Sequence, residues 1–382
     1  MHTTLTTHVR RGTPALVTAA VIGVLYFAGT PQATAQVRDH DPDAILPGPV
    51  PVIASTVPSN GDLNPYGVAF VGKQFPSGGP LNPGDVLVSN FNNAGSPPTG
   101  NLQGTGSTIV RITPTGTLTT FFQGKPAVDF GLTTALGLLN SGFVIVGNLP
   151  TVTGSCPFSG SGSLLILDRK ANIVNTLSDS NLLDGPWDMT VNDEGSRAQL
   201  FVSNVLSGTV TRVNLQISPA GITVESLTRI GSGFMHRCDP AALVVGPTGL
   251  VYDPAKDLLY VASTEDNAVF EIRDAKRRWT DAGTGRIIYH DDVHLHGPLG
   301  MAMSPNGHLI VSNSDVINPD PKHPSELTEF TIEGRFVAQL SIDPNAGGSF
   351  GLAFAQPQGS FVRFAAVDDN VPNITIWNLR IP

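Results

Sequence analysis

The sequence has few charged residues and very few cysteines: only 14% of its 382 residues are Asp, Glu, Lys or Arg, and two are Cys. It also lacks the long amphipathic patterns that predict helices. No glycine-rich phosphate loop opening a helix and no His-Glu-x-x-His motif occurs, so nucleotide-binding and zinc-protease functions have no support. The formal net charge is −9, which makes nucleic acid a poor partner and favours small molecules, cations or other proteins.

The first 35 residues have the layout of a secretory signal peptide. Arg10-Arg11 forms a basic start, residues 15–29 are apolar and uncharged, and Ala33-Thr34-Ala35 is a small-residue cleavage site. An uncleaved membrane anchor is the alternative, although the apolar stretch is short for a full span. Cleavage before Gln36 removes two arginines and no acids, leaving 20 basic and 31 acidic residues, a net charge of −11. We therefore expect a secreted or periplasmic monomer with no membrane span after cleavage.

Glycine and proline are abundant, with 41 and 31 residues, while 40% of the chain is hydrophobic. This composition favours many short strands joined by sharp turns. The phrase Pro298-Leu299-Gly300-Met301 leads through the turn residues 304–307 into a second apolar run that ends at Ser312-Asn313, which is the pattern of a β-hairpin. The same lead phrase occurs six times in all. The others are Pro65-Tyr66-Gly67-Val68, Ala135-Leu136-Gly137-Leu138, Pro186-Trp187-Asp188-Met189, Pro247-Thr248-Gly249-Leu250 and Ser349-Phe350-Gly351-Leu352.

The third residues of successive phrases are 70, 51, 61, 51 and 51 positions apart. A period near fifty predicts propeller blades, each a four-stranded antiparallel sheet. The sixth repeat has only three strands before the chain ends, whereas residues 50–56 form a spare β-like segment at the other end. The sequence therefore predicts an all-β, six-bladed β-propeller over residues 50–382, closed by an N-terminal strand that completes the last blade. Residues 36–49 are expected to be a flexible arm.

The Pro-x-Gly lead, the hairpin and the Val-Ser-Asn ending resemble NHL repeats. More distantly, the chain is similar to the SMP-30/gluconolactonase and paraoxonase propellers. The resemblance covers nearly the whole mature chain and implies the propeller architecture, but one fold hosts many functions. In the metal-dependent members of these families, a residue like Asp368 and asparagines around the channel hold an ion.

Strand alternation predicts which loops share a face of the propeller. Connections between second and third strands lie on the same face as the links between blades. This face, which we call the long-loop face, holds the unusually long segments 91–107, 149–162, 235–246, 291–297 and 314–324. The opposite, short-turn face has mostly tight turns, with 72–84 as the long exception. Binding or catalysis is expected on the long-loop face.

One polar residue recurs at the second-strand end on the long-loop face. These residues are Asn90, Asn148, Asn204, Ser263, Asn313 and Asp368. Their oxygens suit Ca²⁺, so Asn90, Asn148, Asn204, Asn313 and Asp368 are candidate metal ligands. The alternative is that each side chain caps its own strand-to-loop turn. The residue before the glycine, where the metal-dependent families often carry an Asn ligand, is here apolar or aromatic in most repeats, which weakens the metal interpretation.

Histidines form a second group of candidates. His294 and His296 are two positions apart, so on an extended chain they point the same way and can bind Zn²⁺ or act as an acid–base pair. His236 or His323 is the candidate third zinc ligand. The alternative is that all of them are ordinary loop histidines. His294 and His296 are the catalytic candidates if the protein is an enzyme.

Other residues are candidates for ligand contact or covalent bonding. Cys156 and Cys238, in two long loops of an exported protein, predict a disulfide. The candidate ligand-binding residues are Tyr66, Trp187, His236, Arg237 and His323. Two hypotheses follow: a binding or interaction scaffold that uses the long-loop face for a small molecule or protein, and a metal-dependent lactonase, hydrolase or lyase with Ca²⁺ or Zn²⁺ at the central channel.

Overall fold

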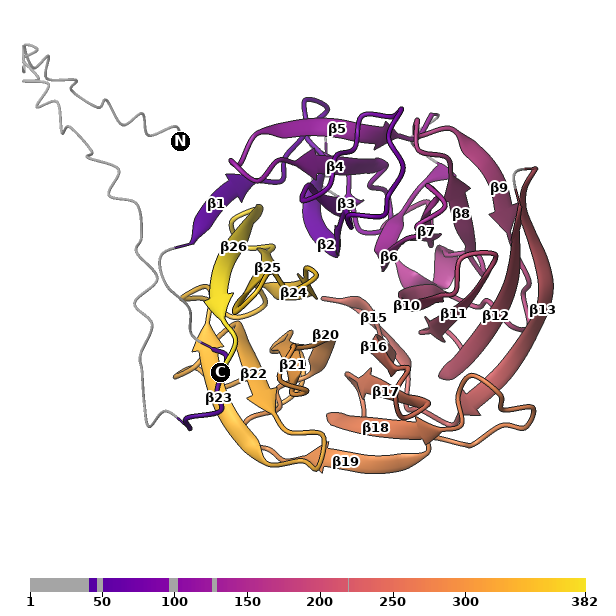
Figure 1. Ribbon diagram of the computed structural model, residues 1–382. Helices are drawn as coiled ribbons and strands as arrows, with labels where there is room; N and C mark the ends of the chain where they lie inside the picture. Colours follow the sequence, from indigo (N-terminus) through magenta and orange to yellow (C-terminus); the bar gives the residue numbers. More distant parts are fainter. Residues whose placement is uncertain (1–40, 47–50, 96–101, 126–128, 219) are drawn as a thin grey trace, which may run out of the picture. The chain divides into compact units, whose positions relative to one another are not determined.

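The computed structural model describes residues 41–46, 51–95, 102–125, 129–218 and 220–382, and the predicted signal peptide lies outside them. The described residues contain no α-helix, and no helix among them is long and apolar enough to cross a membrane. They form six four-stranded antiparallel sheets around an axis, which confirms the predicted six-bladed propeller (Figure 1).

The blades follow one another along the chain. Blade one consists of β2 (Leu63–Phe70), β3 (Val86–Asn92), β4 (Thr108–Ile112) and β5 (Leu118–Gln123). Blade two consists of β6 (Leu132–Leu138), β7 (Val144–Asn148), β8 (Ser163–Leu167) and β9 (Ile173–Leu177). Blade three consists of β10 (Pro186–Asp193), β11 (Arg197–Asn204), β12 (Thr209–Ser218) and β13 (Gly221–Ser232).

Blade four consists of β16 (Pro247–Asp253), β17 (Leu258–Ser263), β18 (Ala268–Arg273) and β19 (Arg286–His290). Blade five consists of β20 (Pro298–Met303), β21 (Leu309–Asn313), β22 (Glu326–Phe330) and β23 (Phe336–Ser341).

Blade six joins the two ends of the described chain. Its strands are β24 (Ser349–Phe354), β25 (Phe361–Asp368), β26 (Asn373–Arg380) and, outermost, β1 (Val52–Ser55). β1 pairs antiparallel with β26, from Val52 opposite Ile376 to Ser55 opposite Asn373. This confirms the predicted closure, in which an N-terminal strand supplies the strand that the last repeat lacks and so leaves no unpaired edge there.

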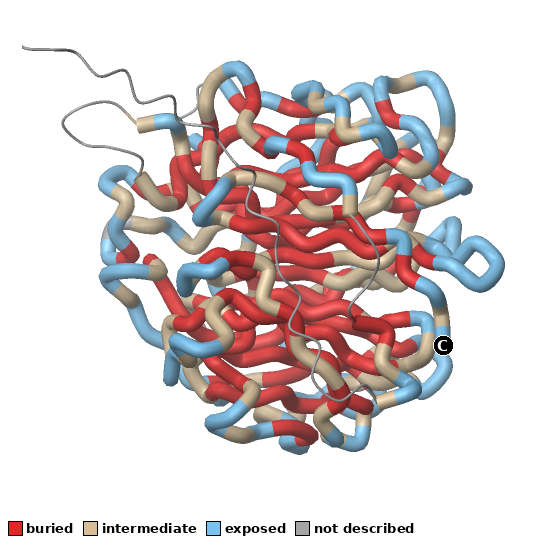
Figure 2. Tube along the Cα trace, turned by 90° about the vertical axis from the view of Figure 1, so that its left-hand side faces the viewer, coloured by how far each residue is buried: buried red, intermediate tan, exposed pale blue. Residues whose placement is uncertain are grey.

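Apolar clusters lie between the blades. Six of the seven buried clusters each join side chains of two neighbouring blades, and the seventh lies at the channel mouth on the long-loop face. Figure 2 shows buried strands through the interior and exposed residues concentrated on the connecting loops. Since each blade buries both of its faces against neighbours, the scaffold is rigid and variation is left to the loops.

The repeated phrases have a structural cause. In the lead phrase, the glycine allows the next blade to approach: a Cβ on Gly300 would lie 2.5 Å from Phe350 O, and one on Gly351 only 1.7 Å from Tyr66 O. In Val-Ser-Asn, the serine joins blades. Ser89 Oγ accepts from Gly67 N at 2.9 Å and donates to the carbonyl of Thr133 in blade two at 2.8 Å. Both motifs are therefore parts of the inter-blade contact.

Residues 41–46, within the segment predicted to be a flexible arm, are packed against blades five and six beside β23 (Figure 1). Ile45 and Leu46 are 3% and 1% exposed. The buried Glu329 carboxylate accepts hydrogen bonds from both of their backbone N–H groups, at 3.0–3.1 Å. These residues are therefore docked, and not a flexible arm as the sequence predicts. Two apolar side chains fill the space between blades five and six, and a carboxylate accepts the hydrogen bonds of the backbone beside them.

Candidate functional site

The channel mouth on the long-loop face is filled by aromatic side chains. Tyr66 stacks on Phe91 and Phe350, with ring centroids 4.7 and 4.6 Å apart, and Trp187 meets Tyr66 edge-on at 5.7 Å. Tyr66 and Trp187 are 3% and 2% exposed, and burial raises the pKa of the Tyr66 hydroxyl far above its usual value. The rings that the sequence suggested for stacking on a ligand instead pack on one another.

A short hairpin covers these rings. It consists of β14 (Arg237–Asp239) and β15 (Leu243–Val245), and Figure 1 shows β15 reaching toward the centre of the ring of blades. Leu243 and Val244 belong to the same buried cluster as Tyr66 and Trp187. The hairpin thus closes the mouth of the channel to a ligand approaching from this face.

The predicted disulfide is confirmed, and it holds the hairpin in place. Cys238 in β14 is bonded to Cys156, which begins the 3-10 turn η2 (Cys156–Phe158) in the long loop of blade two. At the rim of the hairpin, Arg237 pairs with Asp239 and, at 3.0 Å, with Glu265. A chain segment linking blades three and four is therefore anchored to blade two, across the top of the ring.

His236, the other predicted ligand-binding residue beside the hairpin, has a local contact. Its Nδ1 lies 3.1 Å from the carbonyl oxygen of Phe234. This contact keeps the ring within its own connection between blades three and four, apart from the histidines of blade five.

The asparagines at the second-strand ends are held mainly within their own blades. Asn148 Oδ1 accepts from Gly131 N at 2.8 Å, and Asn313 Oδ1 accepts from His296 N at 3.1 Å. These bonds tie each asparagine to the link that enters its blade, and not to its own strand-to-loop turn as the capping alternative expects. In Asn90 and Asn204 the amide nitrogen makes comparable bonds, whereas Oδ1 is buried without a protein partner among the described residues.

The acidic member of this set is Asp368. Its Oδ1 accepts from Asn370 N at 3.0 Å, and burial, reinforced by the neighbouring Asp343 carboxylate, raises its pKa to about 7. Next to it, burial raises the pKa of Asp369 to about 7 as well. Within the described residues, no group of three or more His, Cys, Asp or Glu is arranged to hold a metal ion. The proposed ring does not fit an ion well, because several of its oxygens already accept backbone hydrogen bonds; metal binding stays a prediction.

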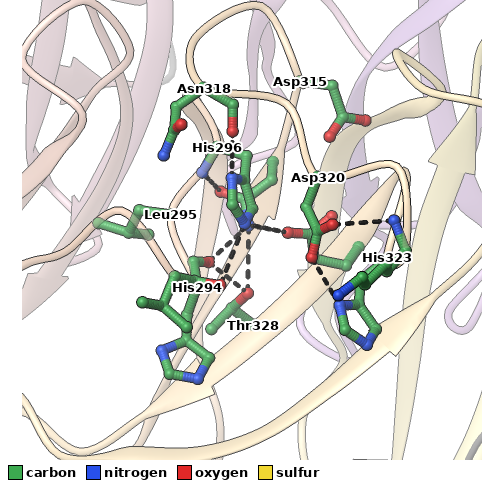
Figure 3. Close-up of polar contacts among 12 residues, drawn as sticks. His294, Leu295, His296, Asp315, Asn318, Asp320, His323 and Thr328 are labelled. Carbon is green, nitrogen blue, oxygen red and sulfur yellow. Dashed lines mark hydrogen bonds and ion pairs between the residues drawn. The ribbon is translucent and has the colours of Figure 1, made fainter.

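His294 and His296 face different surroundings, because residues 291–297 turn instead of running extended. The His294 ring stacks on Phe336 at 3.8 Å, and its Nδ1 lies 2.8 Å from Asp291 Oδ2. The His296 ring is 3% exposed and points into the blade-five loops toward Glu326 (Figure 3). The structure therefore separates the two candidates.

His296 and Glu326 form a buried acid–base pair. His296 Nδ1 contacts the carbonyl of Asn318, and Nε2 lies 3.2 Å from the carbonyl of Val293 and 3.4 Å from Glu326 Oε1. A neutral imidazole has one N–H donor, yet both nitrogens face oxygen atoms. Burial, and then the nearby Asp315 carboxylate, raises the pKa of Glu326 to about 8.

Loop 314–325 encloses this pair. Asp315 Oδ2 accepts from Ser325 N at 2.8 Å and Gly347 N at 3.0 Å, while Asp315 Oδ1 and Glu326 Oε2 are buried with no partner among the described residues. Asp315, Asn318 and Ser325 adopt left-handed backbone conformations, with φ of 58°, 51° and 49°. Strained residues and unpaired buried carboxylate oxygens gather at functional sites.

The structure brings His323, but not His236, into this loop cluster. His323 Nδ1 is 2.7 Å from Asp320 Oδ2, within loop 314–325 (Figure 3). The sequence analysis missed Glu326 and Asp315. Glu326 was recognisable, because a long carboxylate starts this third strand, whereas the equivalent residues in the other blades are Thr, Ser, Ala or Asn.

A third missed residue, Asp188, stands where the other five lead phrases have glycine. Its carboxylate accepts from Met189 N at 2.7 Å and from Leu250 N at 3.3 Å, and it lines a cavity of about 60 Å³ on the axis, beneath the aromatic rings. Burial raises its pKa to about 7. The sequence could have revealed Asp188, because it interrupts the repeated glycine of the lead phrase.

No family model matches the sequence, and no curated protein matches it closely enough to count. Similar solved structures include a protein of unknown function from Bacteroides thetaiotaomicron, with 10% identity, 87% of this chain and 76% of that one covered, and a TM-score of 0.51. Regucalcin from Agrobacterium tumefaciens, described as a calcium-binding protein, has 13% identity, coverages of 86% and 96%, and a TM-score of 0.49.

A gluconolactonase from Xanthomonas campestris has 15% identity, coverages of 90% and 99%, and a TM-score of 0.46. The structural neighbours thus include SMP-30/gluconolactonase-like propellers. At these identities the likeness extends to the fold, not to the activity.

Proposed function

We propose that this protein is an exported binding scaffold that recognises another protein with its long-loop face. The observation that carries the proposal is the closed channel mouth: the disulfide-anchored hairpin and the aromatic rings beneath it replace an entrance for a small substrate. The disulfide is also what an oxidising, extracytoplasmic compartment permits. What this face presents to solvent is a rigid platform of loops.

Exposed apolar side chains on the loops support a protein partner. Val152, Met235, Val293 and Val371 are 82%, 52%, 65% and 54% exposed, and all four belong to connections on the long-loop face. Other large exposed apolar residues lie mostly on outer strands. Apolar tips around a polar, rigid surface are typical of protein interaction sites.

The test compares two sets of four substitutions. In the first, Val152, Met235, Val293 and Val371 are changed to Ser; in the second, four exposed apolar residues of outer strands and the short-turn face are changed, Ile173, Val174, Ile287 and Phe361. The immobilised mature protein is offered extracytoplasmic extract from its source cells, and bound proteins are identified after cross-linking. We expect a stoichiometric partner that is lost with the first set and kept with the second. Equal retention by both would refute the proposal.

A metal-dependent lactonase, hydrolase or lyase is the second candidate, and the specific observation in its favour is the His296–Glu326 pair with its unpaired carboxylate oxygen. A substrate would reach this pair only after loop 314–325 opens, because His296 and Glu326 are 3% and 1% exposed. Elemental analysis for Ca²⁺ and Zn²⁺ tests whether the protein binds a metal. A lactone and ester screen on the wild type, His296→Ala and Asp368→Ala tests whether it is an enzyme. Turnover that the substitutions abolish would establish the enzyme.

A further inference from the structure

The short-turn face carries a groove of about 600 Å³ over blades two and three, remote from the long-loop face. Its walls are the β6–β7 turn with Gly142 and Phe143, the β8–β9 turn with Arg169 and Lys170, and the end of β12 at Ile217. A volume of this size lies in the usual range for small-molecule sites.

Basic side chains outnumber acidic ones in the groove. Neither Arg169 nor Lys170 forms an ion pair within the described residues, where 15 such pairs occur. The adjacent Asp168 carboxylate is occupied by its own turn, accepting from Lys170 N at 2.8 Å and from Asn172 Nδ2 at 2.9 Å. Asp168 also lines the groove, and the Lys170 charge acts on its carboxylate, so the groove carries two cations and one anion. In a chain of net charge −9, this local excess of positive charge favours an anion.

The turn that carries the exposed Arg169 is packed against another loop. Loop 72–84 of blade one crosses to the β8–β9 turn, and a Cβ on Gly79 would lie 2.0 Å from Arg169 O. A Cβ on Gly78 would lie 3.6 Å from Arg169 Nε, so this glycine leaves room beside the guanidinium. Ala171 in the same turn has a left-handed φ of 67°. The one long loop of the short-turn face thus packs against the turn that carries Arg169.

The opposite wall of the groove is apolar. Ile217 is 6% exposed, and the partly buried Phe143 packs with it in the core between blades two and three. We propose that this groove binds a small organic carboxylate, whose anionic group pairs with Arg169 and Lys170 while its apolar body lies on Phe143 and Ile217. A planar guanidinium accommodates a carboxylate through two parallel hydrogen bonds, and the apolar wall selects against inorganic anions.

Ligand-observed NMR titrations test the site, with naphthalene-2-carboxylate as the probe and naphthalene-2-carboxamide, decanoate and inorganic phosphate as comparisons. The carboxylate should bind the wild-type protein at least about tenfold more tightly than the carboxamide, because the charge-assisted pair is lost in the amide. Phosphate alone should bind more weakly than either organic carboxylate.

Substitutions locate the binding. Arg169→Gln should weaken binding of the carboxylate about tenfold or more, and Lys170→Gln less, whereas Arg380→Gln, an exposed arginine of blade six, should leave it unchanged. Thermal midpoints confirm that each variant is folded. Equal affinity for carboxylate and carboxamide, unchanged binding by Arg169→Gln, or no binding of the carboxylate at millimolar concentration would each overturn the proposal.

Discussion

The docked segment 41–46 gives the sharpest prediction about stability, because two of its side chains, Ile45 and Leu46, are almost completely buried. Leu46 is 1% exposed within the apolar seam between blades five and six. Replacing it with alanine removes buried methyl groups and leaves a cavity. The expected loss is about 2–5 kcal/mol of unfolding free energy, the usual range for Leu→Ala in a core.

The hydrogen bonds of the same docked segment predict a second loss of unfolding free energy. Glu329 is fully buried and accepts from Ile45 N, Leu46 N and, at 2.7 Å, His308 Nδ1. In Glu329→Gln, the amide NH₂ would face N–H donors. We expect a cost of about 2–3 kcal/mol, since hydrogen bonds to a charged group are worth more than neutral ones.

Urea unfolding of the mature chain, followed by tryptophan fluorescence, measures both changes. Ile53→Ala is the matched control: Ile53 is also an aliphatic residue near the N-terminus, but it is 59% exposed on β1, so its loss should stay within about 0.5 kcal/mol. If Leu46→Ala were no more destabilising than Ile53→Ala, the segment would not be docked in solution, and the reasoning from its burial would be refuted.

Three further predictions concern the ring, the hairpin and the buried acid. Gly351→Ala should cost several kcal/mol or prevent folding, because its Cβ would lie 1.7 Å from a carbonyl oxygen of the next blade, whereas Gly160→Ala, with nothing within 4 Å, should be nearly neutral by the same urea assay. Removing the disulfide with Cys156→Ser and Cys238→Ser should cost about 4 kcal/mol in the chain-entropy model for a separation of 82 residues; an unchanged urea midpoint would contradict it. Burial raises the pKa of Glu326 to about 8, so its protonation stabilises the fold below the unfolded value of 4.5, and this contribution is lost as pH rises toward 8; the decline in thermal midpoint over that window should be shallower in Glu326→Gln.

The architecture was predictable because the repeated residues form the contacts between neighbouring blades. The glycine of the lead phrase, present in five of the six repeats, admits the neighbouring blade, and the serine of Val-Ser-Asn bonds to that blade from Ser89 and Ser203. Similar residues therefore return along the chain. The closing strand was predictable from a count, since the last repeat lacked one strand and residues 50–56 supplied it. The disulfide followed from two cysteines in long loops of one face.

The site was less predictable, because its geometry depends on loops. Whether His294 and His296 point together depends on the backbone of residues 291–297, and a turn there sends one ring onto Phe336 and the other toward Glu326. Likewise, nothing in the repeat reveals that the hairpin Arg237–Val245 folds back over Trp187. Periodicity fixes strands, whereas loop conformations arise from contacts between distant segments.

The departures from the repeat point to where this propeller differs from a bare scaffold. Asp188 replaces a glycine at the axis, Glu326 replaces a small polar residue at the start of a third strand, and loop 72–84 replaces a tight turn. Each departure places a polar group in a defined place: a carboxylate in the axial cavity, a buried carboxylate beside His296 in blade five, and Arg169 beside a groove. Because the closed mouth separates the axial cavity from the long-loop face, these three places can be altered independently, and a function that depends on one of them should survive changes in the others.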